Sequence, residues 1–303
     1  MRQVHRFHID FWGLRKVFFA ISAVLVIASI AGLAINGLQF GIEFQGGTVI
    51  NVSAAEGVTE GEMRAAFKEQ GVTTESIQTT EDDGFIIRTS ESDPQKANEV
   101  WAAVSEDVGV PQDSGQVTTI GPGWGQAVTN AALLAFVLSI GAILLYIAVR
   151  FEYKMSITAV LALIHDLLIV LGIYALAGRE VTPNTIAALL TIMGYSLYDT
   201  VVVFHRIKEN SANLSKTTFH QMANDSINQV LMRTINTSVC SLIPVLTMLF
   251  FGGETLKDFA FALAIGLFIG TYSSFSVASQ TYVLWKEQEP KFKALNKKYA
   301  TTS

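Results

Sequence analysis

The sequence contains a single cysteine, Cys240, among its 303 residues. One cysteine cannot build a disulfide framework within a chain, so this is not a disulfide-stabilised secreted domain. Because Cys240 lies in an apolar segment, we interpret it as a small packing residue. The nucleotide-binding pattern GxxxxGK[ST] is also absent, which excludes a P-loop ATPase. Any work that this protein does therefore draws on a source other than its own ATP hydrolysis.

Charged residues are scarce as well, at 16% of the chain, while 50% of it is apolar. The apolar residues form six runs of about 20 residues, each long enough to cross a bilayer core of ~30 Å. The runs are Lys16–Asn36, Ala127–Val149, Met155–Ala177, Pro183–Phe204, Val230–Phe251 and Phe259–Val283. The first run follows basic residues, as in a signal peptide. It is longer than a usual signal sequence and no small-x-small cleavage site follows it, so we predict a retained span.

Charge is distributed unevenly along the chain. From Gly37 to Gln126 there are 15 acidic and 4 basic residues, whereas the rest of the chain has 11 acidic and 17 basic residues. With six spans, the basic clusters fall on one side of the membrane, which the positive-inside rule assigns to the cytoplasm. We therefore predict four parts. They are a cytoplasmic N-terminus with the first span (1–36), an extracytoplasmic domain (37–126), five further spans (127–285) and a cytoplasmic tail (286–303).

The extracytoplasmic segment has the pattern of a small α+β domain between spans one and two. Strands are predicted over 46–54, 75–81, 84–90 and 116–122, and helices over 59–71 and 92–109. Thr59 and Glu62 form a capping box, and Asp93 with Pro94 begins the second helix. A turn at Asp82-Asp83-Gly84 joins the middle strands. The order βαββαβ is that of a ferredoxin-like fold. The segment has no His and no Cys, so we predict no catalytic or metal site in it.

Three ionisable residues inside the spans are functional candidates, because a charge there costs several kcal/mol: Asp166, Asp199 and Arg233. Asp199 lies in the cytoplasmic half of the fourth span, within "TIMGYSLYDTVVVFHRIKEN". Tyr195 and Ser196 share its helical face and can donate hydrogen bonds to it. The alternative is an interfacial anchor, in which Asp199 pairs with Arg206, seven residues further along the helix.

Arg233 begins a polar stripe on the fifth span. Gln229, Arg233, Asn236 or Thr237, and Cys240 or Ser241 recur there at helical spacing. Such a stripe faces other helices or a water-filled cleft. Asp199 and Arg233 lie at overlapping depths, so we expect a direct or water-bridged contact. Because a nearby guanidinium favours the charged form of a carboxylic acid, movement of Arg233 would change the proton affinity of Asp199. The pair would then act as a proton-driven switch, and a structural buried ion pair is the alternative.

Asp166 follows His165 near the middle of the third span. Adjacent helical residues point about 100° apart, so the two side chains need not share a face. The pair could extend a proton relay or could be a hydrogen-bonded packing pair. Gly266 and Gly270 form a GxxxG pattern in the sixth span, which indicates close helix packing.

Four segments resemble signatures of the SecD/SecF proteins. The segment "FGIEFQGGT" (40–48), with Gly41, Gly46 and Gly47, resembles the signature that follows the first span. The segment "GYSLYDTVVVFHRIKEN", which begins at Gly194, resembles the fourth-span motif. "RTINTS" (233–238) and "GTYSSFSVAS" (270–279) resemble the fifth-span and sixth-span motifs. Three positions depart from the residues common in the family: Tyr198 stands for Asn, His205 for Asp and Gln280 for Pro.

The resemblance implies one six-span half of a resistance-nodulation-division transporter in the bacterial inner (cytoplasmic) membrane. SecD would supply the other half as a heterodimeric partner. The pair would act with the SecYEG channel, the translocating preprotein and other accessory subunits. The proton-motive force would drive or complete translocation, with Asp199 and Arg233 conducting protons. We expect a transport subunit rather than an enzyme, with no cofactor, no metal and no nucleic-acid partner.

Two other functions remain as alternatives. One is a proton-driven small-molecule efflux transporter of the same superfamily. The other is a passive scaffold of the translocon, in which Asp199 and Arg233 are structural. Replacement of Asp199 by Asn separates the coupled subunit from the scaffold.

Overall fold

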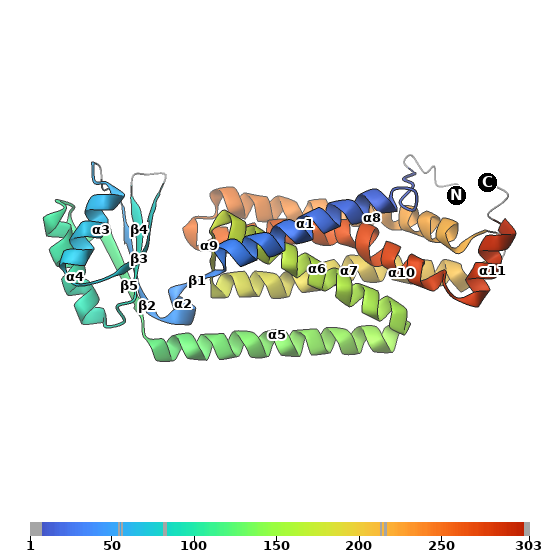
Figure 1. Cartoon of the computed structure of the whole chain (residues 1–303), viewed down its shortest axis with the longest axis horizontal. Coiled ribbons are helices and arrows are strands. Elements are labelled where there is room, and N and C mark those ends of the chain that lie inside the picture. Colours follow the sequence, from blue (N-terminus) through green and yellow to red (C-terminus); the bar gives the residue numbers. More distant parts are fainter. Residues whose placement is uncertain are drawn as a thin grey trace. The chain divides into compact units, whose positions relative to one another are not determined.

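A computed structural model describes residues 8–53, 55, 57–80, 84–212, 214 and 217–299. The chain divides into two compact units, and each is described here by itself (Figure 1). The helical unit comprises residues Met1–Gln39 and Phe136–Ser303, and the α/β unit comprises Phe40–Ala135.

The described residues form six helices that are long and apolar enough to cross a membrane, which confirms the six predicted spans. The first five spans are α1 (Arg15–Asn36), α5 (Pro122–Arg150), α6 (Tyr153–Ala177), α7 (Pro183–Ala212) and α8 (Phe219–Phe251). The sixth span joins α9 (Glu254–Ser273), the π-helix η2 (Ser274–Ala278) and α10 (Ser279–Lys286). The two-residue strand β6 (Glu180–Val181) lies between α6 and α7, and α11 (Pro290–Tyr299) follows α10.

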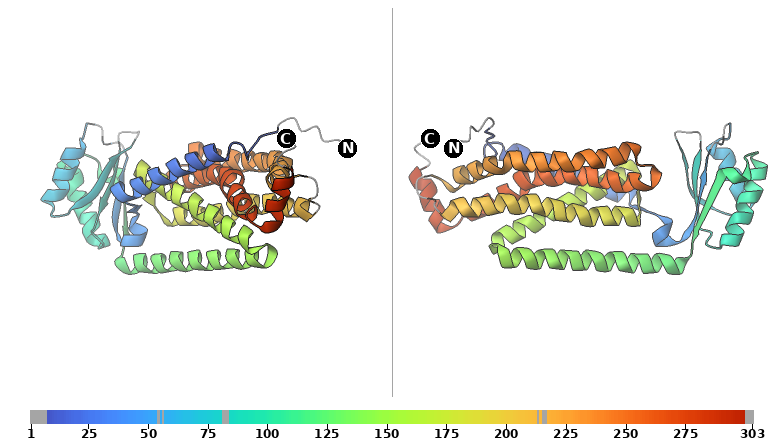
Figure 2. Two further views of the ribbon diagram at one scale, coloured as in Figure 1. Left: turned by 45° about the vertical axis from the view of Figure 1, so that its right-hand side comes forward. Right: turned by 180° about the vertical axis from the view of Figure 1, so that it is seen from behind.

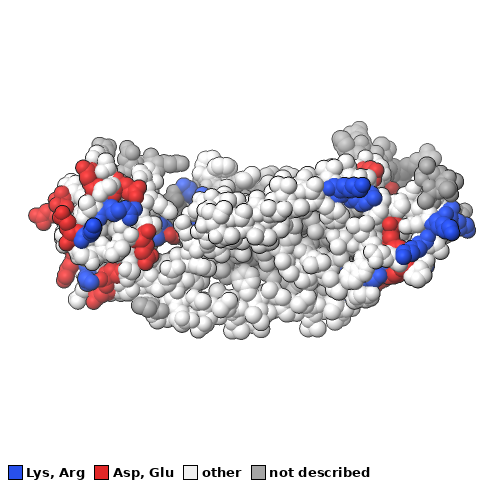
Figure 3. All heavy atoms as spheres, viewed as in Figure 1, with Lys and Arg blue, Asp and Glu red and all other residues white. Residues whose placement is uncertain are grey.

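Helices α7, α8 and α9 lie side by side, and α1 packs along α6 (Figures 1 and 2). Their shared core contains large buried side chains such as Met155, Met193 and Phe204. The outward faces of α1, α5 and α8 carry exposed aliphatic side chains instead, as expected of surfaces solvated by lipid. On the face shown in Figure 3, the helices are almost free of charged residues, and Lys and Arg gather at the end with α11.

That charged end is held together by polar contacts. Lys154 pairs with Glu289 at 2.9 Å and His220 Nδ1 lies 2.7 Å from Glu287. Burial raises the pKa of Glu287, but the hydrogen bonds that it accepts from His220 and Asn296 outweigh burial and hold that pKa below its ordinary value. These contacts fix the ends of α6, α8 and α10 to one another.

The α/β unit contains a four-stranded antiparallel sheet with strand order β3-β4-β2-β5. The elements follow as β2 (Gly47–Val52), α3 (Glu60–Glu69), β3 (Thr74–Thr79), β4 (Phe85–Thr89), α4 (Pro94–Asp107) and β5 (Gly115–Ile120). Every predicted strand and helix is present, and each observed end lies within two residues of the predicted one. The short elements β1 (Gln39–Phe40), α2 (Ile42–Gln45) and the 3-10 helix η1 (Gln112–Ser114) were not predicted. The predicted turn at Asp82-Asp83-Gly84 includes positions outside the described residues.

The core of this unit is formed by side chains from one face of the sheet and from both helices. Met63, Phe67, Trp101 and Ile87 are almost completely buried in it. Trp101 also donates its indole N–H to the Gln112 carbonyl at 2.9 Å. The sheet and its two helices therefore form one continuous apolar layer.

The capping box that starts α3 supports a stability prediction. Thr59 Oγ1 accepts the Glu62 N–H at 3.3 Å, and Glu62 accepts the Thr59 N–H at 2.8 Å. We expect Thr59→Ala to destabilise α3 by about 1 kcal/mol. Amide hydrogen exchange in the first turn of α3, measured on the full chain, should then be about fivefold faster. Thr59→Ser keeps the acceptor and should exchange at the wild-type rate, and equal rates in all three proteins would contradict the prediction.

Candidate functional site

Two glycines of α9 let that helix approach α7 closely. A Cβ placed on Gly266 would lie 2.3 Å from the Ile192 side chain, and one on Gly270 would lie 2.9 Å from the Cβ of Ser196. A larger residue at either position would push the helices apart. The predicted packing role of the GxxxG pattern is therefore confirmed, and it brings Ser196 and Asp199 next to the polar residues of α9.

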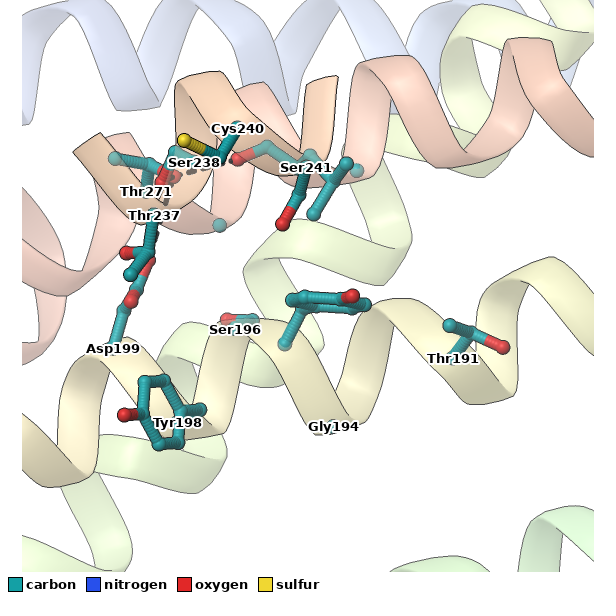
Figure 4. A pocket seen from close by; sticks show the side chains of 14 residues that line it. Thr191, Gly194, Ser196, Tyr198, Asp199, Thr237, Ser238, Cys240, Ser241 and Thr271 are labelled. Carbon is teal, nitrogen blue, oxygen red and sulfur yellow. Dashed lines mark hydrogen bonds between the residues drawn. The ribbon is translucent and has the colours of Figure 1, made fainter. Parts of the chain in front are cut away.

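Asp199 is 7% exposed, and the groups that hydrogen-bond to it are the hydroxyls of Thr271 and Ser238. Thr271 Oγ1 on α9 donates to Asp199 Oδ2 at 3.4 Å, and the hydroxyls of Thr271 and Ser238 lie 2.6 Å apart. Figure 4 shows the carboxylate extended from α7 toward these residues. Among the described residues, no Lys, Arg or His forms an ion pair with Asp199. The carboxylate thus sits between three helices without a compensating positive charge.

Arg233 contacts the neighbour of Asp199 rather than Asp199 itself. Its Nη2 donates to the Tyr198 hydroxyl at 3.1 Å, so the predicted direct contact of Asp199 with Arg233 is not formed. The interfacial-anchor alternative is also wrong in this structure, because Arg206 donates to Gln229 and to Glu209. Counting residues along the two helices correctly placed Arg233 near Asp199. The Tyr198 side chain on α7, however, forms the hydrogen bond with Arg233 that was expected for Asp199.

Asp166 is completely buried and joins three helices. Its Oδ2 accepts hydrogen bonds from Ser196 Oγ on α7 at 2.6 Å and from Ser273 Oγ on α9 at 2.8 Å. Its Oδ1 lies 2.9 Å from His165 Nδ1, so the two adjacent residues do meet. The predicted bond from Ser196 to Asp199 is replaced by the bond to Asp166. The other ring nitrogen of His165, Nε2, is buried without a partner.

A cavity of about 560 Å³ lies beside Asp199 between α7, α8 and α9 (Figure 4). We call it the Asp199 cavity. Its walls carry hydroxyls, a thiol and glycines, including Tyr195, Ser196, Thr237, Ser238, Cys240, Ser241, Gly194 and Thr271. The polar stripe of α8 therefore faces a cavity and not only lipid. Tyr195 and Thr237 line this cavity, and the Thr237 hydroxyl donates to backbone carbonyls of α8 rather than to the Asp199 carboxylate.

The glycines of the first signature lie in the α/β unit. Gly41 precedes α2, Gly46 ends it, and Gly47 begins β2 with φ 121°. A Cβ at Gly47 would come within 2.5 Å of the Thr89 carbonyl oxygen, so only glycine fits this close strand approach. These glycines shape the entry into the sheet, whereas Gly194 lines the Asp199 cavity.

Sequence reasoning missed three residues that contact the buried carboxylates: Ser238, Thr271 and Ser273. For Thr271 and Ser273, the available signal was the density of hydroxyl residues in the sixth span, whereas Ser238 lies on α8 beside the polar stripe. Helical spacing alone could not assign them, because α9 passes into the π-helix η2 directly after Ser273. A π-turn changes which side chains share a face and is frequent at functional sites.

Two family models match the chain. The model described as "Protein export membrane protein SecD/SecF, C-terminal" matches residues 100–288. The model described as "SecD/SecF GG Motif" matches residues 31–58. Between them they include both glycines of the GG signature and every residue of the Asp199 cavity.

Curated relatives and solved structures agree with these models. The protein translocase subunit SecF of Streptomyces coelicolor is 39% identical to this chain, and the alignment covers 95% of this chain and 80% of that subunit. The subunit SecF of Pseudomonas aeruginosa is 34% identical, with 91% of each chain covered. A crystal structure of SecDF from Thermus thermophilus has a TM-score of 0.85 at 33% identity and covers 95% of this chain but 40% of that chain. The chain therefore belongs to the SecD/SecF family of protein export membrane proteins.

Proposed function

We propose that this chain is an accessory subunit of the Sec protein-export translocase that uses the proton-motive force together with a SecD partner. The translocase role is supported by the names of its relatives. The Thermus thermophilus relative is named SecDF, and this chain covers 38% of it, which leaves length for a SecD part. We propose that a separate SecD chain fills that place, and that SecYEG and the translocating preprotein are further partners.

The observation that carries proton coupling is the environment of Asp199. A carboxylic acid in a membrane span is expensive to ionise unless a positive charge or several donors compensate it. Among the described residues, Asp199 has neutral hydroxyl donors only, with Thr271 Oγ1 at 3.4 Å, and it faces a cavity that can hold water. Arg233, the cation predicted to act with Asp199, donates to Tyr198 one residue away. A shift of Arg233 toward Asp199 would favour release of the proton, and its return would favour uptake.

Charge distribution supports the orientation of the chain. The ends of α6, α7 and α10 that carry Lys154, Lys208 and Lys286 belong in the cytoplasm by the positive-inside rule. We propose that both termini lie there and that the acidic α/β unit is extracytoplasmic, in a bacterial inner membrane. The strand order β3-β4-β2-β5 with two helices supports classification of this unit as ferredoxin-like.

A second candidate function, proton-driven efflux of a small molecule, is favoured by the Asp199 cavity. Its volume of about 560 Å³ lies within the range of ordinary ligand pockets. In that case, the gradient would stimulate extrusion of a dye from vesicles without any effect on protein export.

The proposed function is tested in inverted membrane vesicles with and without this chain. We expect completion of preprotein translocation to be faster with a proton gradient when the chain is present, and this difference to disappear when the chain is depleted. Co-purification of a SecD-type chain should accompany the activity. If depleted vesicles with a normal level of SecYEG responded to the gradient as strongly as vesicles that contain the chain, the proposal would be contradicted.

A further inference from the structure

Two cavities of the helical unit adjoin at one side chain. The first is the Asp199 cavity. The second, of about 740 Å³, lies between α5, α7 and α8 and contains the charged residues Arg150, Arg206, Glu209 and Arg233. We call it the Arg233 groove. Of the described residues that line these two spaces, Tyr198 alone belongs to both.

Both helices place the boundary between the two spaces at the same level. On α7, Asp199 lines the Asp199 cavity, while Val201 and Val202 line the Arg233 groove, and Tyr198 precedes them. On α8, Arg233 lines the groove and Thr237, one turn further along, lines the cavity. The Tyr198 hydroxyl accepts the hydrogen bond from Arg233 at 3.1 Å and so bridges α7 to α8 at this boundary.

We propose that Tyr198 is a partition that controls the passage of water from the Arg233 groove to Asp199. The groove holds ionised side chains, which require water inside a membrane span. The Asp199 cavity is lined by small and hydroxyl-bearing residues, and a proton reaches its carboxylate only along water or hydrogen-bonding groups. A phenol ring across the boundary interrupts that route, and the Arg233 bond holds the ring in place. Tyr198 is thus a positioning residue, and the inference rests on the proposed role of Asp199.

The single cysteine of the chain provides a direct test. Cys240 is exposed on α8 and lines the Asp199 cavity but not the Arg233 groove. The full chain, with the partner chains that co-purify with it, is placed in lipid nanodiscs and treated with sulfonatoethyl methanethiosulfonate. This anion enters water but not lipid. We expect Tyr198→Ala to raise the modification rate of Cys240 about tenfold, which corresponds to ~1.4 kcal/mol of removed barrier. Tyr198→Phe keeps the ring but loses the anchor, and its rate should lie between those of wild type and Tyr198→Ala.

Tyr195→Ala is the matched control. Tyr195 lies one turn away on α7, is exposed to a similar degree (46% against 50% for Tyr198) and lines the Asp199 cavity alone. In Tyr195→Ala, Cys240 should be modified at the wild-type rate. An equal rise in both alanine variants, or no rise in Tyr198→Ala, would contradict the proposal that Tyr198 controls the passage of water. Tyr198→Asn replaces Tyr198→Ala if the latter does not accumulate. Because labelling needs no proton gradient, a failed partition is distinguishable from a failed proton-coupling function, which Asp199→Asn tests separately.

Discussion

Asp199→Asn is expected to abolish the acceleration of preprotein translocation by a proton gradient and to leave gradient-independent translocation unchanged. Asparagine has nearly the same shape and can still accept the Thr271 hydroxyl, so the packing of α7 against α9 is preserved. It cannot bind and release a proton in the accessible pH range. The translocation rate of the variant in the presence of a gradient should equal the rate of wild-type vesicles without one.

The matched control for this variant is Asp225→Asn, the same chemical change on α8. The Asp225 side chain is 61% exposed and its Oδ1 lies 4.0 Å from His8 Nε2, so its replacement should leave the gradient response intact. Translocation is measured in inverted vesicles that contain equal amounts of each variant. If Asp199→Asn retained the full response at a normal protein level, Asp199 would be a structural residue and the scaffold alternative would stand.

The sequence predicts the architecture well because its signals are local. Runs of about 20 apolar residues define spans whatever their neighbours are, and all six recur as helices. The predicted helix caps are also local, because each joins groups at most three residues apart in the chain. The caps formed by Thr59, Glu62 and Asp93 are confirmed in the structure. Close approach at Gly266 and Gly270 also follows from a short pattern.

The contacts of the site were harder to predict because they depend on how helices are rotated against one another. Ser196 shares a face with Asp199, three residues away, yet its hydroxyl bonds to Asp166 on α6. A helical wheel gives the face of a side chain but not the partner that reaches it first. Arg233 lies at the predicted depth, but Tyr198 is long enough to bind it before Asp199 does. The tyrosine at position 198 therefore replaces the predicted contact with one of its own.

Asp166→Ala is expected to lower the stability of the helical unit by on the order of 3 kcal/mol, because it leaves several buried donors without an acceptor. The hydroxyls of Ser196 and Ser273 and the Nδ1 of His165 all meet this one carboxylate. Since His165 Nε2 is buried without a partner, we assign a ring proton to Nδ1, which donates it to Asp166. The midpoint of thermal unfolding in detergent, measured on the full chain, should fall clearly below the wild-type value.

Asp166→Asn separates packing from proton relay at this residue. The amide oxygen can still accept from both serines, while the amide N–H₂ faces the Nδ1 proton of His165, so the thermal midpoint should fall between those of wild type and Asp166→Ala. If Asp166 only holds α6, α7 and α9 together, this variant retains most of the gradient response of translocation, unlike Asp199→Asn. A variant with wild-type stability but no gradient response would place Asp166 in the proton route. The convergence of three helices on one fully buried carboxylate favours the first outcome, because the same bonds that satisfy Asp166 also fix the spacing between α7 and α9 on which the Asp199 cavity depends.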